Sequence, residues 1–252
     1  MNPKEYSKNQ PIIEMYGCLQ SEGKLTGVPH ILIRTTGCTL RCQFSKTDFC
    51  DSSYTSWSPE KGTFSLNNVI NFFKKHPQIK HTMITGGSPT MHENLLRELC
   101  IIAKSFGHYI TIETEGSKYV STVADFISLS PKFSNSTPKL GTLQPNGKEV
   151  TLSHVKRHEK YRKNHEAMGK MIKAHGEYQL KPVVSSVDDL EEIKYIQEKL
   201  NIPNNKVYLM PAGGTVSELE KHRSWLMEYC WQNGYNYTDR IHIIAYGEKR
   251  GF

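Results

Sequence analysis

Three of the six cysteines lie within thirteen positions and could together bind one metal centre. Cys38 and Cys42 follow a run of apolar, β-branched residues, and Cys50 comes eight residues after Cys42. Four thiolates would indicate a closed structural zinc site, whereas three leave one coordination position open for an exogenous ligand. The spacing by itself also fits a zinc site completed by a histidine such as His30, or cysteines that cluster by chance. The cluster therefore predicts a metal centre whose nature the spacing leaves open.

The other three cysteines do not share this loop. Cys100 lies on the apolar face of an expected helix and Cys230 lies beside Trp231, which favours packing in the core for both. Cys18 is close in sequence to polar residues, and its role stays open. Six cysteines in 252 residues are too few for a disulfide scaffold.

Two further patterns could contribute to a site. Gly86 and Gly87 follow an apolar run, where a glycine pair lets the backbone approach a ligand or simply turns a strand into a helix. Glu113 and Glu115 alternate on an expected strand, so we expect only one of them to face a given pocket.

Alternating secondary-structure elements would position these residues. Near-continuous apolar strands that alternate with helices predict a parallel sheet covered by helices, closed or partly closed like a barrel. Functional residues of such folds lie in the loops after the carboxyl ends of the strands. The expected strands are 28–36, 79–85, 108–114, 125–130, 178–184, 206–210 and 240–246, and the expected helices are 65–75, 91–106, 153–174, 187–200 and 215–233.

One segment interrupts this alternation. Residues 133–177 begin with a polar stretch and continue as a strongly basic helix, and ten Lys or Arg face only three acids from Lys132 to Lys173. We interpret the segment as an insertion or an elaborated crossover within a single domain of residues 1–252. Its basic part, 154–173, fits a solvated helix face or a contact with a nucleic acid or another partner.

Length and composition exclude several classes of protein. A chain of 252 residues with a net charge of +7 can bury one large core, and its aromatic content of 10% argues against disorder. No run of about 18 apolar residues predicts a membrane span. The first residues lack the apolar region of a secretory signal, so we expect a cytoplasmic protein without a membrane partner.

Motifs in the expected order resemble radical S-adenosylmethionine (SAM) enzymes, specifically the 7-carboxy-7-deazaguanine synthase family. The resemblance runs through residues 12–132 and resumes at 178–252. Each motif is weak alone, and their order makes the resemblance specific. The motifs are Glu14-Met15-Tyr16-Gly17-Cys18-Leu19-Gln20-Ser21-Glu22-Gly23, Ile33-Arg34-Thr35-Thr36-Gly37-Cys38, Phe49-Cys50-Asp51-Ser52, Thr85-Gly86-Gly87-Ser88-Pro89, Glu113-Thr114-Glu115-Gly116, Ser128-Leu129-Ser130-Pro131-Lys132, Gln179-Leu180-Lys181 and His242-Ile243-Ile244-Ala245-Tyr246-Gly247-Glu248-Lys249-Arg250-Gly251-Phe252.

The resemblance implies an α/β fold, a partial TIM-like barrel of the radical SAM type with the basic helical segment inserted. It implies a [4Fe-4S] cluster bound by Cys38, Cys42 and Cys50, with one iron free for SAM. It also places a Mg²⁺ ligand at Ser52. The SAM-binding residues that it implies are Phe49, Asp51, Gly87, Ser88, Ser130, Pro131 and Lys132.

The implied reaction converts 6-carboxy-5,6,7,8-tetrahydropterin to 7-carboxy-7-deazaguanine with loss of ammonia, which makes the chain a carbon–nitrogen lyase of queuosine-type biosynthesis. Gln20 and Glu22 suit the edge of the pterin ring, and Arg34 suits its carboxylate. The implied partners are an electron donor such as flavodoxin and a second copy of the chain in a homodimer. The implied substrate-binding residues are Leu19, Gln20, Ser21, Glu22, Arg34, Thr85 and Phe252.

Three departures from the family pattern stand out. Seven residues separate Cys42 from Cys50 where the family has two, and we expect the extra residues to bulge outward. Position 88 is serine where the family has a glutamate that helps to bind the SAM amino group. Ser21 replaces a glycine of the amino-terminal loop.

Two other functions fit parts of the sequence. A radical SAM activase that acts on a partner protein would share the cysteines but not the Leu19–Gly23 loop. A non-enzymatic Fe-S or zinc protein that binds nucleic acid would use the net positive charge. Whether a deazaguanine product would serve tRNA or DNA modification is open.

Overall fold

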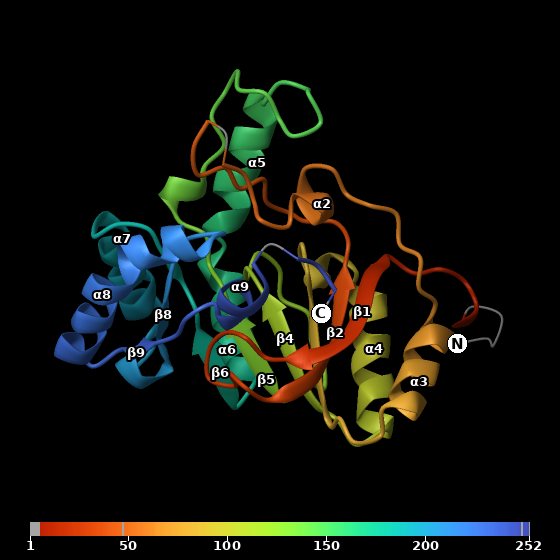
Figure 1. Cartoon of the computed structure of the whole chain (residues 1–252). Coiled ribbons are helices and arrows are strands. Elements are labelled where there is room, and N and C mark those ends of the chain that lie inside the picture. Colours follow the sequence, from red (N-terminus) through yellow and green to blue (C-terminus); the bar gives the residue numbers. More distant parts are fainter. Residues whose placement is uncertain (1–5, 47, 248, 252) are drawn as a thin grey trace.

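A six-stranded, mostly parallel sheet forms the centre of the molecule in a computed structural model that describes residues 6–46, 48–247 and 249–251 (Figure 1). Strand β1 pairs antiparallel with β2, and every later neighbour is parallel. The carboxyl ends of β2 to β6 therefore lie along one edge of the sheet. In order across the sheet, the strands are β1 Ile12–Leu19, β2 Pro29–Thr35, β3 His81–Gly86, β4 Tyr109–Thr114, β5 Phe126–Leu129 and β6 Glu177–Leu180.

A smaller parallel sheet continues beyond β6. It consists of β7 Val183–Val184, β8 Tyr208–Pro211 and β9 Asn236–Tyr237. A parallel bridge between Leu180 and Val207 connects the end of β6 to the segment that leads into β8. The two sheets thus present their strand ends in the same direction.

Helices follow the strands and cover the sheet. Helix α3 spans Leu66–Lys75, α4 Glu93–Ser105, α6 His165–Ala174, α7 Asp188–Leu200 and α8 Val216–Asn233. Sequence signals explain several boundaries. Ser65 and Asn68 form a capping box at the start of α3, Thr215 and Glu218 form another at α8, and Gly234 ends α8 with a φ of 70°.

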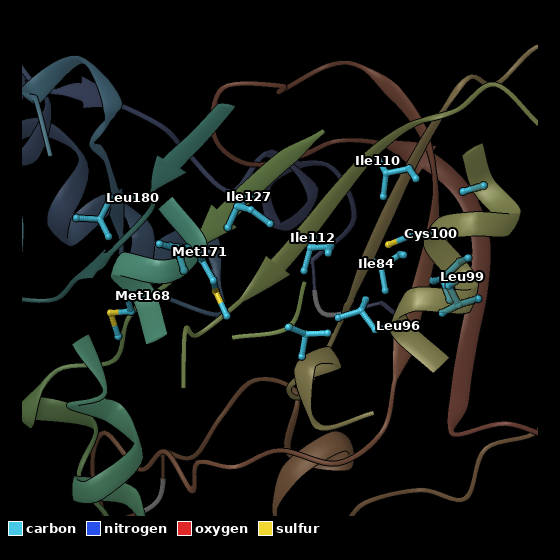
Figure 2. Close-up of a cluster of buried hydrophobic side chains, with 14 of the residues drawn as sticks. Ile84, Leu96, Leu99, Cys100, Ile110, Ile112, Ile127, Met168, Met171 and Leu180 are labelled. Atoms are coloured by element: carbon cyan, nitrogen blue, oxygen red, sulfur yellow. The ribbon is translucent and has the colours of Figure 1, made fainter. Parts of the chain in front are cut away.

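The core lies between the sheet and these helices (Figure 2). Ile84, Ile110 and Ile112 of the strands lie opposite Leu96 and Leu99 of α4, and all five are almost inaccessible to solvent. Truncation of such a leucine to alanine typically costs about 2–5 kcal/mol. The position of the strand ends is therefore set by a well-packed interior.

The expected strands over 28–36, 79–85, 108–114, 125–130 and 206–210 are confirmed, and so are helices α3, α4, α7 and α8. The single strand expected over 178–184 is instead two strands, β6 and β7, which belong to different sheets. The expected helix over 153–174 is two helices, α5 Leu152–Arg162 and α6, because Asn164 caps α6 through its Oδ1 and donates to Ser117 O at 2.9 Å. The β1 strand and β9 were not predicted.

The expected strand over 240–246 is wrong. Residues Ile241–Tyr246 form helix α9, in which only Ile243 is fully buried. The run of β-branched residues indicated a strand. However, the parallel ladder ends at β9, and no further strand pairs with this segment in the described part of the chain. None of the described helices is long and apolar enough to cross a bilayer.

Candidate active site

The three clustered cysteines meet at the carboxyl edge of the large sheet. Cys38 and Cys42 are buried with Leu40 between them, and Cys50 and Tyr161 pack against this group. Within the described residues, no three Cys, His, Asp or Glu side chains already form a ligand set for one metal ion. Three thiols converging from one loop fit a cluster that binds each thiolate at a different iron.

Burial controls the protonation of these thiols in the absence of a metal. Burial raises the pKa of Cys38 and of Cys42 well above the ordinary value of a thiol, and it raises the pKa of Cys50 to about 11. The positive charge of Lys132 offsets part of this increase for Cys42 and Cys50. A metal that binds the thiolate form would displace these protons.

The long spacer between Cys42 and Cys50 folds back on itself. Gln43 and Phe49 form an antiparallel bridge, and Phe44 N donates to Asp48 O at 2.8 Å. Cys50 N then donates to Cys42 O at 3.2 Å, so the two cysteines lie close despite the seven residues between them. Phe44, Lys46 and Asp48 of this spacer are exposed, which agrees with the expected outward bulge.

The basic segment 133–177 holds the cysteine loop. Gln43 N donates to Ser136 O at 2.9 Å, and its side-chain Oε1 accepts from Lys139 N at 2.7 Å. Arg41 N donates to His158 Nδ1 of α5 at 3.2 Å. Figure 1 shows α5 beside the loop and beside α2, Ser53–Ser56.

Trp57 contacts both the cysteine loop and helix α5. Its Nε1 donates to Cys42 O at 2.9 Å, and its ring lies 5.7 Å from that of His154. An open hollow of about 680 Å³ next to Cys50 is lined by Phe49, Leu143 and Gln144, among others. No sequence motif indicated that 133–177 supports the cysteines.

The glycine pair lies directly against the cysteine loop. Gly86 has a φ of 147°, and a Cβ there would come 2.2 Å from Thr35 O. A Cβ on Gly87 would come 2.3 Å from Gly37 O. Ser88 N donates to Gly37 O at 2.8 Å. Close approach of two backbones therefore requires glycine at both positions.

Glu113 and Glu115 reach different groups of the candidate site. Glu115 lies just after β4, is 6% exposed, and accepts from Ser88 Oγ at 2.7 Å. Glu113, on β4, pairs with Lys181 Nζ at 2.7 Å. The turn after Thr114 ends the strict alternation, and so the two carboxylates point to different groups.

A second set of charges gathers around Glu22. Lys181 pairs with Glu22, and Arg240 Nε lies 3.2 Å from Glu22 Oε1. Burial alone would raise the pKa of Glu22, but attraction to Lys181 and Arg240 outweighs it and holds the pKa well below the usual range. Gln20 is buried beside them and donates from Nε2 to Glu22 O at 3.1 Å. Glu22 is therefore an anion at neutral pH.

Arg240 also connects this network to the cysteine loop. Its Nη2 lies 2.6 Å from Asp51 Oδ2, and its Nη1 donates to Gly213 O at 2.6 Å. The sequence motifs did not single out Arg240, because it precedes the matched carboxyl-terminal motif. Lys181 stood in a quoted motif, and a lysine within an apolar strand region was the signal that could have marked it.

Lys132 lies just after β5, three residues beyond the end of the strand at Leu129. Its Nζ donates to Ser130 O at 2.7 Å and to Ser130 Oγ at 2.8 Å. Ser130 N donates to Thr114 O, which places this motif at the same sheet edge as Glu115. Pro131 lies between the two and is buried.

Arg34 lies at the end of β2, paired in register with Thr85 of β3. Its Nε donates to Glu14 Oε2 at 2.5 Å, and Arg250 Nε lies 2.7 Å from Glu14 Oε1. The Arg250 guanidinium lies 3.5 Å from the centre of the Tyr54 ring. Arg250 thus lies against Glu14, the residue of β1 that is aligned with Arg34.

Three of the remaining predicted residues lie in the described part of the chain. Ser52 immediately precedes α2, and Ser21 O accepts from Ile241 N of α9 at 3.2 Å. Leu19 ends β1 and is exposed. Phe252 lies outside the described residues.

Comparison with known proteins identifies the family. A 7-carboxy-7-deazaguanine synthase of Halobacterium salinarum is 33% identical over 244 residues, which cover 94% of this chain and 91% of the relative. The chain belongs to the 7-carboxy-7-deazaguanine synthase family. A synthase of Rhodopirellula baltica is 35% identical over 240 residues, covering 95% of this chain and 88% of the relative. No family model matches the chain.

The fold agrees with this family. A crystal structure of QueE from Escherichia coli superposes with a TM-score of 0.62 at 21% identity, covering 93% of this chain and 95% of that one. The chain is thus a radical SAM enzyme of deazaguanine biosynthesis with a mostly parallel α/β sheet. For a 7-carboxy-7-deazaguanine synthase, the family implies a [4Fe-4S] cluster and SAM. Neither the activase nor the non-enzymatic alternative is supported.

Proposed function

We propose that this chain converts 6-carboxy-5,6,7,8-tetrahydropterin to 7-carboxy-7-deazaguanine with loss of ammonia. The observation that carries the proposal is the convergence of Cys38, Cys42 and Cys50 beside the Gly86–Gly87 turn. When bound, the reduced cluster and SAM supply the radical that abstracts hydrogen from the substrate. The protein's own groups bind, orient and shield these molecules.

The strands are proposed to form an incomplete barrel. The parallel order of β2 to β6, the bridge from Leu180 to Val207 and the parallel β7 to β9 support a continuous curved wall. Active sites of barrels lie at the carboxyl ends of their strands, where the cysteines and glycines stand. We treat residues 1–252 as one domain with 133–177 inserted.

SAM is proposed to bind along this edge. The glycines allow the backbone to approach the ligand, and Lys132, held by Ser130, offers a cation. Phe49 and Asp51 flank Cys50, and Arg240 holds Asp51 in place. The residues assigned to SAM are Phe49, Asp51, Gly87, Ser88, Ser130, Pro131 and Lys132.

The pterin is proposed to bind between β1, β2 and the segment after β1. Glu22, kept ionised by Lys181 and Arg240, accepts hydrogen bonds from N–H groups of the ring. Arg34 binds the substrate carboxylate. To do so, its guanidinium must either break its ion pair with Glu14 or contact both carboxylates at once. The residues assigned to substrate are Leu19, Gln20, Ser21, Glu22, Arg34, Thr85 and Phe252.

A Mg²⁺ ion is proposed at Ser52. Ser52 follows Asp51 in the sequence. The hydroxyl of Ser52, water and the substrate carboxylate would supply the oxygen ligands that a hard cation prefers. Mg²⁺ usually keeps several waters and few protein ligands, so Ser52 would share the ion with water and the substrate carboxylate.

An acidic one-electron donor such as flavodoxin is proposed to approach over α5. Lys156, Arg157 and Lys160 are exposed there, and Tyr161 of the same helix packs on the cysteines. Arg162 does not belong to this surface, because it is 6% exposed and pairs with Glu159 and Glu192. The same basic face could instead contact tRNA or DNA, which is the second candidate role of 154–173.

A homodimer and a cytoplasmic location complete the proposal. Met227 and Trp231 of α8 are exposed beside an open hollow of about 570 Å³, and they supply an apolar surface for a second copy. The six thiols are unpaired, which suits a reducing compartment.

An anaerobic turnover assay tests the reaction. Reconstituted protein is given SAM, a reductant and the carboxytetrahydropterin, and the products are measured by mass spectrometry. We expect 7-carboxy-7-deazaguanine and ammonia, and neither from Cys50→Ala. SAM cleavage without any deazaguanine product would refute the assigned substrate.

A further inference from the structure

Glu115 is a buried carboxylate surrounded by hydroxyl groups. Its Oε1 accepts from Thr39 Oγ1 at 2.6 Å, from Ser88 Oγ at 2.7 Å and from Ser117 Oγ. Its Oε2 has one long bond, from Thr114 Oγ1 at 3.3 Å. One oxygen is therefore saturated, and the other retains acceptor capacity.

Other carboxylates near the strand ends form an ion pair with a lysine, whereas Glu115 has no ion pair with a described residue. Glu22 and Glu113 pair with Lys181, and Asp125 at the amino end of β5 pairs with Lys104. A buried carboxylate served only by neutral donors is costly to desolvate. A ligand that brings positive charge or N–H donors to Oε2 would offset that cost.

The position of Glu115 indicates which ligand that is. Thr39 adjoins Cys38, and Ser88 follows the glycine turn, so the carboxylate is held by both segments that surround the cysteines. Position 88 carries serine, and its hydroxyl donates to Glu115 instead of supplying a carboxylate itself. The negative charge beside the cysteine loop thus comes from Glu115, after β4, and not from position 88, after β3.

We infer that Glu115 binds the amino group of SAM and replaces the carboxylate absent from position 88, with Thr39, Ser88 and Ser117 holding it in place. This inference rests on the proposed SAM-dependent function. It assigns Oε2 as the acceptor for the amino N–H groups. It also explains why the chain tolerates serine in the Gly86-Gly87-Ser88-Pro89 turn.

Binding of SAM to anaerobically reconstituted protein tests the inference without turnover. Calorimetry gives the Kd, and the change in the electron paramagnetic resonance signal of the reduced cluster reports ligation. Glu115→Gln keeps the size of the side chain and its acceptor oxygen but loses the charge. We expect its Kd for SAM to rise about 10- to 100-fold, the range for a charge-assisted hydrogen bond.

A swap of the carboxylate makes the test independent of folding defects. Ser88→Glu combined with Glu115→Ser returns a carboxylate to the other strand end, and we expect its Kd to lie within about three-fold of the wild type. Asp125→Asn, which removes a carboxylate at the opposite end of the sheet, is the matched control and should leave the Kd unchanged.

Three outcomes overturn the inference. The first is an unchanged Kd for SAM in Glu115→Gln. The second is a swap variant that retains the cluster but binds SAM at least 10-fold more weakly than the wild type. The third is a swap variant that loses the cluster. The last outcome would assign Glu115 a structural role that position 88 cannot assume. Failure of the reaction itself is separate: wild-type protein would then bind SAM but form no deazaguanine.

Discussion

Arg240 Nη2 lies 2.6 Å from Asp51 Oδ2 and thereby joins the start of α9 to the residue after Cys50. The same guanidinium contacts Glu22, so one side chain connects the residues proposed for SAM and for substrate. The contact is formed across 189 positions of sequence.

Replacement of Arg240 should impair both stability and catalysis. Arg240→Gln leaves Glu22 with Lys181 alone, and the loss of a largely buried partner costs about 3 kcal/mol. We expect urea denaturation to show this loss, and kcat/KM to fall about 10-fold or more as Asp51 and Glu22 shift. Arg223→Gln is the control, because Arg223 pairs with Asp239 at 2.8 Å without contacting either site carboxylate. Equal kcat/KM in the two variants would contradict the role of Arg240.

Iron binding should depend on the three clustered cysteines and not on the fourth one nearby in sequence. Cys50→Ser should abolish the iron–sulfur absorbance after anaerobic reconstitution, because hydroxyl is a poor ligand for the cluster. Cys18→Ser should retain it, since Cys18 Sγ lies 3.5 Å from His30 Nε2 near the other end of β2. Loss of iron from Cys18→Ser would show that a different set of thiols binds the metal.

Deletion of residues 44–48 should preserve the cluster. Gln43 and Phe49 are bridge partners, so their direct connection needs little rearrangement and restores two residues between the cysteines. We expect iron content and absorbance close to those of the wild type. Deletion of residues 137–148 is the contrasting variant, because it removes the contacts of Gln43 with Lys139 and Thr142 and should lower reconstitution yield. Complete loss of iron in the shorter deletion would mean that the spacer itself positions Cys50.

Charge reversal on α5 should separate electron delivery from chemistry. Lys156→Glu, Arg157→Glu and Lys160→Glu together should lower the turnover rate with flavodoxin several-fold, most strongly at low salt, because attraction accelerates association. The rate with dithionite should not change. Lys74→Glu with Lys75→Glu on α3 is the control for charge reversal at a site away from the cysteines. Loss of RNA binding with an unchanged flavodoxin rate would favour the nucleic-acid role of this helix.

Acid should destabilise the protein through histidines at the amino ends of β2 and β3. Burial lowers the pKa of His30 and of His81 to about 4 in each case. Between pH 6.5 and 4 the unfolded chain binds protons that the folded chain does not. The free energy of unfolding therefore falls as pH decreases, by about 1.4 kcal/mol per pH unit for each histidine, and the contribution is absent above pH 6.5.

Denaturation at several pH values checks this dependence. Burial also lowers the pKa of His158 to about 4. His81→Gln should therefore remove at most about a third of the slope between pH 6.5 and 5, whereas His222→Gln on α8 should leave it unchanged. A slope in His81→Gln equal to that of the wild type would show that other groups cause the acid sensitivity.

Local patterns were sufficient for most of the fold. The apolar runs that became β2 to β6 and β8 are buried on both faces, and this is the signal that near-continuous hydrophobicity provides. The 240–246 segment is also rich in β-branched residues but forms α9, and among the described residues no strand pairs with it. β1 was not predicted. Its antiparallel pairing with β2 aligns Glu14 with Arg34, a contact between strands that the local pattern does not report.

The sequence alone determined the chemistry: three thiols with one open coordination position, a glycine turn and the order of motifs that marks the family. Only the tertiary structure decided which charges these groups meet. Glu115 reaches Ser88 and Arg240 reaches Asp51 because strand pairing and helix packing bring together residues 27 and 189 positions apart. Periodicity reports the local face of an element, whereas such contacts depend on how the elements are packed against one another.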